Sequence, residues 1–377
     1  MSMPTEPRTS AEALGLNDDG CFSVLGSDGV VVGDTPESEE PSAGGADVDM
    51  YVAMRRLRAC DARAAALRAE GRIGPYAGAA GEEATLVASA MALGPEDWIF
   101  PGRRDHGLTL VRDVDGGAVA RFFHHLFATG GDPAKGRPGL GGTTARGARI
   151  ASAGGPAAGH LCHAVGFAWA ARARGEDVVT LASGRGAGVT AGASFHDALN
   201  FAGVLRAPVV FVGRYEARPD RPRKGEDDAT SSSVPAATVA SGRVGRFPSA
   251  RARGEAYGVP GIRCDGMDPL AVYRVVRDAV RRARRGEGAS WVEAVVHPLD
   301  GVRGAALDPL VRLRRYLVAR GRWDDEAERA LEARTQGQID AAVSEAGSAP
   351  GPARATLFED VYRALPPFLV AQRDAVP

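Results

Sequence analysis

The chain has 377 residues, and its 46 Lys and Arg side chains almost balance its 47 Asp and Glu side chains, which gives a formal net charge of −1. A chain of this length can bury the core of one large α/β domain with appendages or of two modest domains. The balanced charge argues against binding to nucleic acid or to an anionic membrane, because both need a strongly basic surface.

The cysteines and the N-terminus bear on the cellular compartment. Four cysteines lie far apart, without the paired spacing of a zinc site or a small disulfide scaffold. The first residues lack the charged start and apolar core of a signal peptide, and no apolar run approaches the ~20 residues of a membrane span. The sequence therefore predicts a cytoplasmic protein.

The first 48 residues are polar and rich in Pro, Gly, Ser and acidic residues, so we predict a flexible N-terminal arm. One apolar island, at residues 21–32, is suited to pack as a strap on a partner. From Asp49 to Gly71, apolar residues recur at spacings of three and four, which is typical of an amphipathic helix. This helix opens a globular α/β region that we place at residues 49–300.

Helical and strand patterns then alternate along the chain. We expect helices at residues 82–93, 118–128 and 163–175, and strands at residues 98–101, 178–182 and 208–212. A polar turn, GRRDHG, follows the first strand. Residues 129–159 are glycine-rich and irregular, and a loop of that length in a compact domain is expected to line a site.

The same alternation continues after a polar segment, residues 217–254, that we predict to be mobile. A strand at 262–264, a helix at 270–284 and a strand at 291–296 favour a mostly parallel sheet flanked by helices. Residues 308–377 are then expected to form C-terminal helices, with Pro309 in a first turn and further helices at 324–345 and 357–365. The predicted fold class is α/β.

The glycines after the strand at 178–182 suggest a phosphate site. Gly186-Ala187-Gly188-Val189-Thr190-Ala191 fits the dinucleotide fingerprint GxGxxA, with Glu216 near the next strand end to bind a ribose. That motif is weak by itself, and it leaves a dinucleotide-binding oxidoreductase as a lesser alternative. The HLCH run at 160–163 does not place its side chains on one helix face, so packing explains it better than a metal.

Several longer segments share one resemblance. In order they are FPGRRDHG from Phe100, HLCHAVGFAWAARARGED from His160, GASFHDALNFAGVLRAPVVFV from Gly192, GVPGIRCDGMDPLAVY from Gly258 and DPLVRLRRYLVARGRWDDE from Asp308. They resemble the α subunit of the thiamine-diphosphate-dependent decarboxylase component of 2-oxo acid dehydrogenase complexes, in particular its branched-chain and pyruvate members.

The resemblance implies a thiamine-diphosphate-binding fold, with thiamine diphosphate and Mg²⁺ held between an α and a β subunit in a heterotetramer. An intact relative would decarboxylate a branched-chain 2-oxo acid or pyruvate and pass the acyl group to a lipoyl-bearing acyltransferase. The positions implied for the diphosphate include arginines, whose planar donors suit phosphate, and the glycine turn. They are Arg103, Arg104, Gly186, Gly188, Val189, Arg214 and Glu216.

The resemblance fails at the metal ligands and at the catalytic loop. Ala187 has no side-chain oxygen where the family has a carboxylate, Glu216 replaces an amide, and the cationic Arg218 adjoins a carbonyl ligand. Val302 stands where the family has a loop histidine, and the nearby His297 is better suited to a structural role. The family's potassium positions fall on Gly154, Gly159 and His160, which also lack the expected side-chain oxygens.

We therefore expect no metal ligand and no catalytic residue to be retained. Two interpretations follow. In the favoured one, the chain is a degenerate paralogue, a pseudoenzyme that keeps the fold for assembly or regulation. In the alternative, it is a working or weakened thiamine-diphosphate enzyme with a rearranged diphosphate site.

Overall fold

The computed structural model describes residues 21–32, 45–113, 116–137, 144–152, 158–216, 250–297, 299, 306–359 and 362–375. Expectations for residues 1–20, 33–44 and 217–249, for Gly154, and for Val302 in the catalytic loop fall outside these residues. Within the described parts of the chain, no helix is long and apolar enough to cross a membrane.

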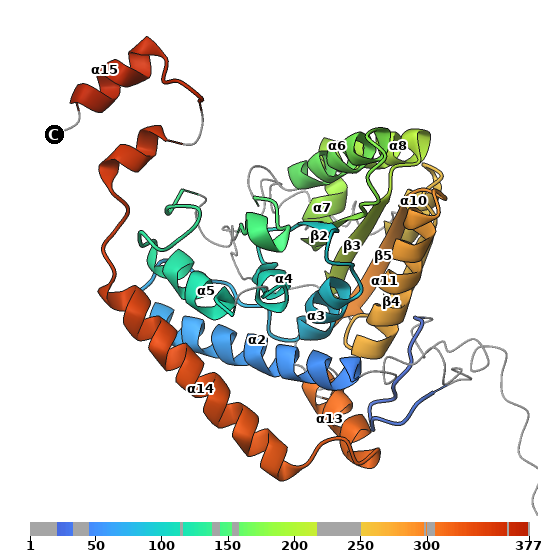
Figure 1. The fold of residues 1–377 in the computed structure, drawn as a ribbon. Coiled ribbons are helices and arrows are strands. Elements are labelled where there is room, and N and C mark those ends of the chain that lie inside the picture. Colours follow the sequence, from blue (N-terminus) through green and yellow to red (C-terminus); the bar gives the residue numbers. More distant parts are fainter. Residues whose placement is uncertain are drawn as a thin grey trace, which may run out of the picture.

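A five-stranded sheet lies at the centre of the molecule, and all its strand pairs are parallel (Figure 1). Its spatial order is β1-β2-β3-β5-β4. The strands are β1 (Trp98–Phe100), β2 (Thr180–Arg185), β3 (Val209–Glu216), β4 (Gly261–Asp265) and β5 (Ser290–Val296). This arrangement confirms the predicted α/β class with a parallel sheet.

Successive side chains along each strand point to opposite faces of the sheet, and both faces are buried. On β3, Val210 and Val212 face one hydrophobic cluster, whereas Val209 and Phe211 face the other. The second cluster includes Trp291 of β5, which stacks on Phe211 with ring centroids 5.7 Å apart. The chain thus forms a three-layer sandwich.

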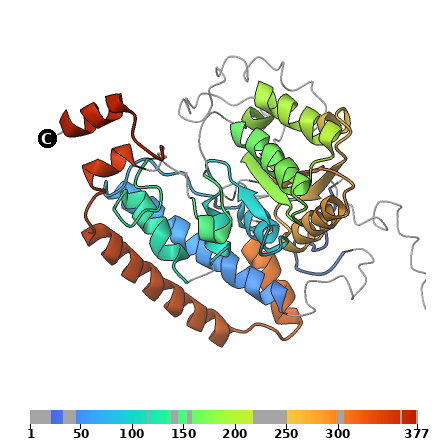
Figure 2. The same ribbon diagram turned by 45° about the horizontal axis from the view of Figure 1, so that its top comes forward.

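Helices form the two outer layers (Figures 1 and 2). The larger layer packs on the Val210 face and consists of α2 (Ala46–Ala69), α3 (Glu83–Met91), α4 (His106–Val111), α5 (Ala118–Phe127), α11 (Pro269–Arg284), α13 (Pro309–Ala319) and α14 (Asp325–Ser348). The other face is covered by α6 (Gly159–Ala173) and α8 (Ala193–Leu205). Short helices α7 (Ala187–Ala191) and α10 (Ala250–Glu255) follow β2 and precede β4.

The described part of the predicted N-terminal arm is ordered. Residues 21–32, which we call the strap, pack against this chain's own β4: Phe22 N–H donates to the Arg263 carbonyl at 3.0 Å, and Asp265 N–H donates to the Phe22 carbonyl at 2.9 Å. Helix α2 begins at Ala46, before the boundary predicted at residue 48. The strap is therefore part of the folded body.

Two predictions in the second half of the chain need correction. Residues 250–254, assigned to a mobile segment, belong to α10, which packs on β4 and β5. The single helix predicted at 357–365 is replaced by the 3₁₀ helix η3 (Arg354–Phe358) and by α15 (Pro367–Ala375). Proline disfavours a helix at the residue before it but fits a first turn, so Pro366 and Pro367 set the start of α15.

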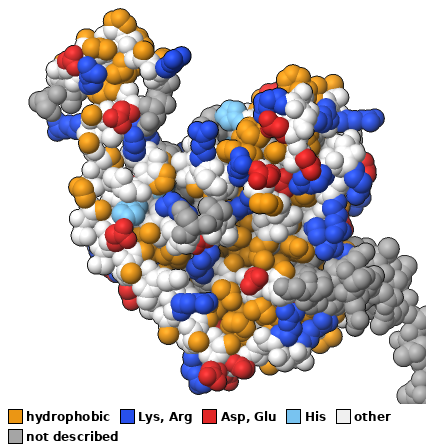
Figure 3. Space-filling view, viewed as in Figure 1, with side chains coloured by type: hydrophobic (Ala, Val, Ile, Leu, Met, Phe, Trp, Pro, Cys, Tyr) orange, Lys and Arg blue, Asp and Glu red, His pale blue; other side chains and the backbone are white. Residues whose placement is uncertain are grey.

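The C-terminal helices are not a separate unit. Leu313 and Leu317 of α13 and Ile339 of α14 belong to the main hydrophobic cluster, and α14 runs along α2 and α5. On the face shown in Figure 3, basic and acidic side chains are interspersed and do not form a basic patch. The mixture of acidic and basic side chains on that face is consistent with the near-zero net charge of the chain.

Candidate functional site

The carboxyl ends of β2 and β3 lie side by side, with Arg185 paired in register with Arg214. In open parallel sheets, ligands bind outside the carboxyl ends of the strands. The loop after β1, residues 101–105, and the residue before α3, Glu82, reach the same edge, because both contact Arg214 or its neighbours. This edge is the candidate site.

The strand before the turn at this edge ends later than predicted, and only one of the predicted turn glycines turns the chain. Strand β2 continues to Arg185, so the chain turns at Gly186, whose φ of 75° and ψ of 176° suit glycine. Gly188 and Val189 already lie in α7, and the Val189 N–H donates to the Gly186 carbonyl at 3.3 Å. The residue at the strand end is therefore Arg185, within Gly184-Arg185-Gly186, and Ala187 begins the helix.

Arg214 is fully buried and held by three side chains. Its Nε donates to Glu82 Oε2 at 2.6 Å, its Nη1 to Ser183 Oγ at 2.7 Å, and its Nη2 to Asp105 Oδ1. Burial opposes its charge, but Asp105 and Glu82 outweigh burial and raise the pKa of Arg214. The predicted diphosphate contact from Arg214 does not fit this geometry, because its guanidinium is already committed inside the protein.

Arg185 continues the same network toward solvent. Its Nε contacts Glu82 Oε1, and its Nη2 lies 4.0 Å from Glu216 Oε2, which is the limit of an ion pair. The side chains of Arg185 and Glu216 are each 37% exposed, in contrast to the buried Arg214. We call the row Asp105, Arg214, Glu82, Arg185 and Glu216 the charge chain.

The buried end of the charge chain is fixed by the loop after β1. Asp105 Oδ2 accepts the Gly102 N–H at 2.7 Å, and its Oδ1 accepts from Arg214. Burial by itself would raise the pKa of Asp105, but Arg214 and the Gly102 hydrogen bond lower it below its usual value. A side chain on Gly102 would meet the Ser183 carbonyl at 2.9 Å, so the loop can approach β2 only with glycine there.

Two predicted phosphate-binding residues lie on this loop. Arg103 is exposed and Arg104 is partly buried, directly before Asp105. The loop therefore brings both arginines to the edge where Gly186 turns the chain. Neither belongs to the charge chain, which uses Arg185 and Arg214 as its cations.

His160 supports the end of β2 from α6. Its Nε2 lies 2.7 Å from the Ser183 carbonyl, and a neutral ring with a proton on Nε2 donates there. Burial lowers the pKa of His160, although the Ser183 hydrogen bond and Asp105 oppose that effect. His160, which the resemblance places at a potassium site, thus holds the end of β2 in place.

A second buried polar cluster lies beside the loop, and sequence reasoning missed it. His106 Nε2 is 2.6 Å from Asp61 Oδ1 and 3.0 Å from the Tyr76 hydroxyl, while Asp61 Oδ2 accepts the Ala79 N–H at 2.7 Å. The hydrogen bonds from His106 and Tyr76 outweigh burial and lower the pKa of Asp61. This cluster ties α2, α4 and the segment before α3 together.

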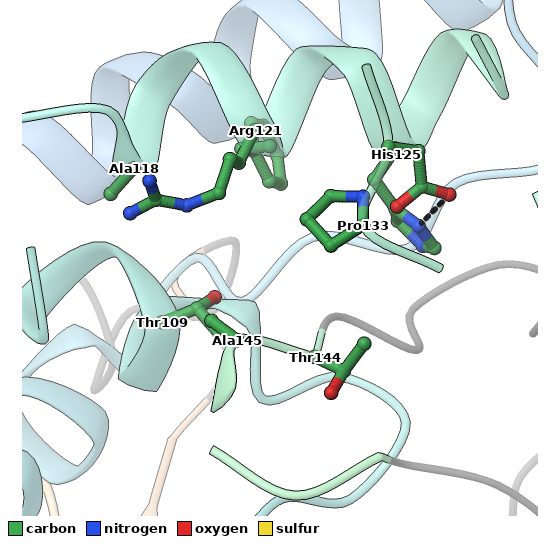
Figure 4. A pocket seen from close by; sticks show the side chains of 9 residues that line it. Thr109, Ala118, Arg121, His125, Pro133, Thr144 and Ala145 are labelled. Carbon is green, nitrogen blue, oxygen red and sulfur yellow. Dashed lines mark hydrogen bonds and ion pairs between the residues drawn. The ribbon is translucent and has the colours of Figure 1, made fainter. Parts of the chain in front are cut away.

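A small pocket opens between α5 and the segment that follows it (Figure 4). His125 Nδ1 lies 3.2 Å from Asp132 Oδ2 on its wall. No residue of the charge chain lines it; its lining is Thr109, Ala118, Arg121, Phe122, His125, Asp132, Pro133, Thr144 and Ala145. The pocket is therefore distinct from the strand-end site.

Comparison with known proteins identifies the family to which this architecture belongs. Residues 51–214 and 236–301 match the family described as the dehydrogenase E1 component. The chain is 32% identical over 341 residues to the 3-methyl-2-oxobutanoate dehydrogenase subunit alpha of Mycobacterium tuberculosis strain H37Rv. The aligned region covers 86% of this chain and 85% of that protein.

It is also 30% identical over 351 residues to the pyruvate dehydrogenase E1 component subunit alpha of Staphylococcus aureus strain Mu50, covering 86% and 84% of the two chains. The chain belongs to the dehydrogenase E1 component family. The resemblance to E1 α subunits is thereby confirmed, and the dinucleotide-binding alternative is left without support.

The strand-end residues of this E1 chain do not fit the Mg²⁺ that the resemblance implies. Mg²⁺ needs near-octahedral oxygen ligands, and the carboxylates at this edge are already paired with guanidinium groups. Among the described residues, no group of three or more His, Cys, Asp or Glu side chains could hold a metal ion. The end of β2 itself carries a cation, Arg185.

The structure brings some predicted E1 site residues together and leaves others apart. Arg103, Arg104, Gly186, Arg214 and Glu216 reach one edge of the sheet. His297 is buried just beyond β5, in keeping with a structural role.

The residues that sequence reasoning missed are Glu82, Asp105 and Arg185. Their signals were present: GEEA at the start of a helix, an acid directly after the double arginine, and a charged residue between two glycines after an apolar strand.

Proposed function

We propose that this chain is the α-type subunit of a 2-oxo acid dehydrogenase assembly and pairs with a β-type subunit in a heterotetramer. The relatives named above are α subunits of such enzymes, and they match this chain over most of its length. The family match over residues 51–214 and 236–301 supports a conserved scaffold.

We further propose that this subunit is catalytically impaired and serves assembly or regulation. The E1 family depends on thiamine diphosphate, which is held through a divalent metal. The observation that supports impairment is the charge chain, because Arg185 and Arg214 contact both oxygens of Glu82, and Glu216 at the end of β3 lies at ion-pair distance from Arg185.

A second candidate function is a working thiamine-diphosphate enzyme with a rearranged diphosphate site. The observation in its favour is the position of Arg103 and Arg104 on the loop that packs against β2 at this edge. Guanidinium groups can bind phosphate oxygens directly. In that case the subunit would still supply acyl groups to a lipoyl-bearing acyltransferase.

Co-expression with a β-type subunit separates these functions. The proposal predicts a stable complex in size-exclusion chromatography with light scattering, no Mg²⁺-dependent heat on titration with thiamine diphosphate, and no turnover of 3-methyl-2-oxobutanoate or pyruvate with an artificial electron acceptor. Mg²⁺-dependent micromolar binding together with turnover would establish the second candidate. Failure of every β-type subunit to bind would refute the assembly role.

A further inference from the structure

Glu82 is shared by two arginines from neighbouring strands. Arg185 contacts its Oε1 and Arg214 contacts its Oε2, and these two arginines are paired in register on β2 and β3. Side chains in register on parallel strands point to the same face, so two like charges would repel there without a carboxylate between them. Glu82 holds this pair, and Glu216 completes the neutralisation of Arg185.

The guanidinium group of Arg185 therefore lies between two carboxylates, with Nε toward Glu82 and Nη2 toward Glu216. The residue is covalently fixed at the strand end, and its guanidinium remains charged at every physiological pH. A divalent metal between Glu82 and Glu216 would have to displace it and would also face the buried charge of Arg214. Both effects oppose metal binding.

We propose that Arg185 is a built-in cation that takes the place of a divalent metal between Glu82 and Glu216, so that this edge of the sheet is metal-independent. This inference deepens the proposed function, on which it rests, by giving the reason why the subunit does not load Mg²⁺. It concerns the chain's own carboxylates and is measurable without any enzymatic activity.

An anion is a less suitable ligand for this group of side chains. The charge chain contains three carboxylates and two guanidinium groups, so its formal charge is negative. Its exposed end carries Glu216, which would repel a phosphate approaching Arg185. The cations of the charge chain are thus matched to its own acids.

Mn²⁺ titrations of the purified full-length chain, followed by electron paramagnetic resonance, test the proposal. The wild type and Arg185→Lys are expected to show only weak, non-stoichiometric binding, because both keep a cation at the strand end. Arg185→Ala is expected to gain one Mn²⁺ site with affinity at least about tenfold above the wild-type background. Arg174→Ala, which removes an exposed arginine paired with Glu176, is the matched control and should gain nothing.

A double variant places the gained site. Adding Glu216→Gln to Arg185→Ala should abolish the new Mn²⁺ site, because it removes one of the two carboxylates. In parallel, Mg²⁺ should raise the melting temperature of Arg185→Ala relative to a sample in EDTA, whereas the wild type should respond as Arg174→Ala does. The thermal measurement also shows that each variant is folded.

Stoichiometric Mn²⁺ binding by the wild type would overturn the proposal, as would a folded Arg185→Ala variant that gains no site. These outcomes can be distinguished from a failure of the proposed function. A wild type that turns over substrate in complex with a β subunit without any divalent metal would refute impairment but keep Arg185 in the metal's place. A chain that gains the Mn²⁺ site but binds no β subunit would refute only the assembly role.

Discussion

Two ionic networks hold this protein together at opposite parts of the sheet, and they differ in how they end. At β4, Arg312 lies between Asp265, 2.9 Å from its Nη1, and the carbonyls of Leu25 and Gly26 in the strap. Asp268 accepts the N–H groups of Val24 and Leu25, both at 2.6 Å. The side chains of this network are buried, and Gly26 is partly buried. The charge chain at β2 and β3 begins in the same way but ends at the half-exposed pair Arg185 and Glu216.

The difference separates structural charge from charge at a site. When the charged side chains of a network are all enclosed by the protein, they can be replaced by apolar residues without changing how the surface binds a ligand. A network that ends at the surface keeps charged groups where a ligand could reach them. The strap network therefore reports on folding, and the outer end of the charge chain reports on binding.

The largest expected effect is at the inner end of the charge chain. Arg214→Met leaves Asp105 and Glu82 buried without their shared partner, and breaking a buried ion pair in this way costs about 3–5 kcal/mol. Urea unfolding followed by circular dichroism measures the loss, with Arg174→Met as the exposed control. A loss no larger than that of the control would show that the inner end is as open as the outer end.

A smaller loss is expected when the strap network is broken. Asp268→Ala removes the acceptor of two strap N–H groups and the N-cap of α11, where Asp268 accepts from Leu270 N–H at 3.0 Å. Buried donors left without a partner cost about 1–3 kcal/mol, and loss of a cap about 1 kcal/mol, so we expect a total of about 2–4 kcal/mol. Hydrogen exchange at Val24 and Leu25 should accelerate more than exchange on β2. Equal acceleration of both regions would mean that the two networks are not independent.

The smallest effect is a pH dependence at His160. Burial lowers the pKa of His160 in the folded state, whereas an unfolded histidine titrates near about 6.5. The unfolded chain therefore binds the proton first, and this part of the stability is complete above about pH 6.5 and declines as the pH falls toward the folded value. His160→Gln should flatten the change in unfolding free energy between about pH 7 and about pH 5. His163, exposed on the same helix, is one of the charges that lower the pKa of His160, so His163→Gln should flatten the change only in part.

The sequence predicted the alternation of strands and helices because buried parallel strands and amphipathic helices leave clear patterns. It also led to the strand-end site, since Arg104, Gly186, Arg214 and Glu216 lie on segments that parallel strands bring to one edge. It did not predict the partners of Arg214, because Glu82 and Asp105 approach from segments separated by 132 and 109 residues along the chain. The sequence could not say which glycine turns the chain, because three glycines alternate at 184, 186 and 188 and only the backbone distinguishes them.

The strap also constrains the order in which the molecule can form. Gly26 and Arg312, which hold each other in the finished structure, are 286 residues apart along the chain. During synthesis the strap leaves the ribosome long before β4, α11 and α13, and it has no docking surface until these elements have been made. Val24 and Leu25 must therefore remain uncovered through most of the synthesis of the folded body, and this early segment is among the last to reach its final place.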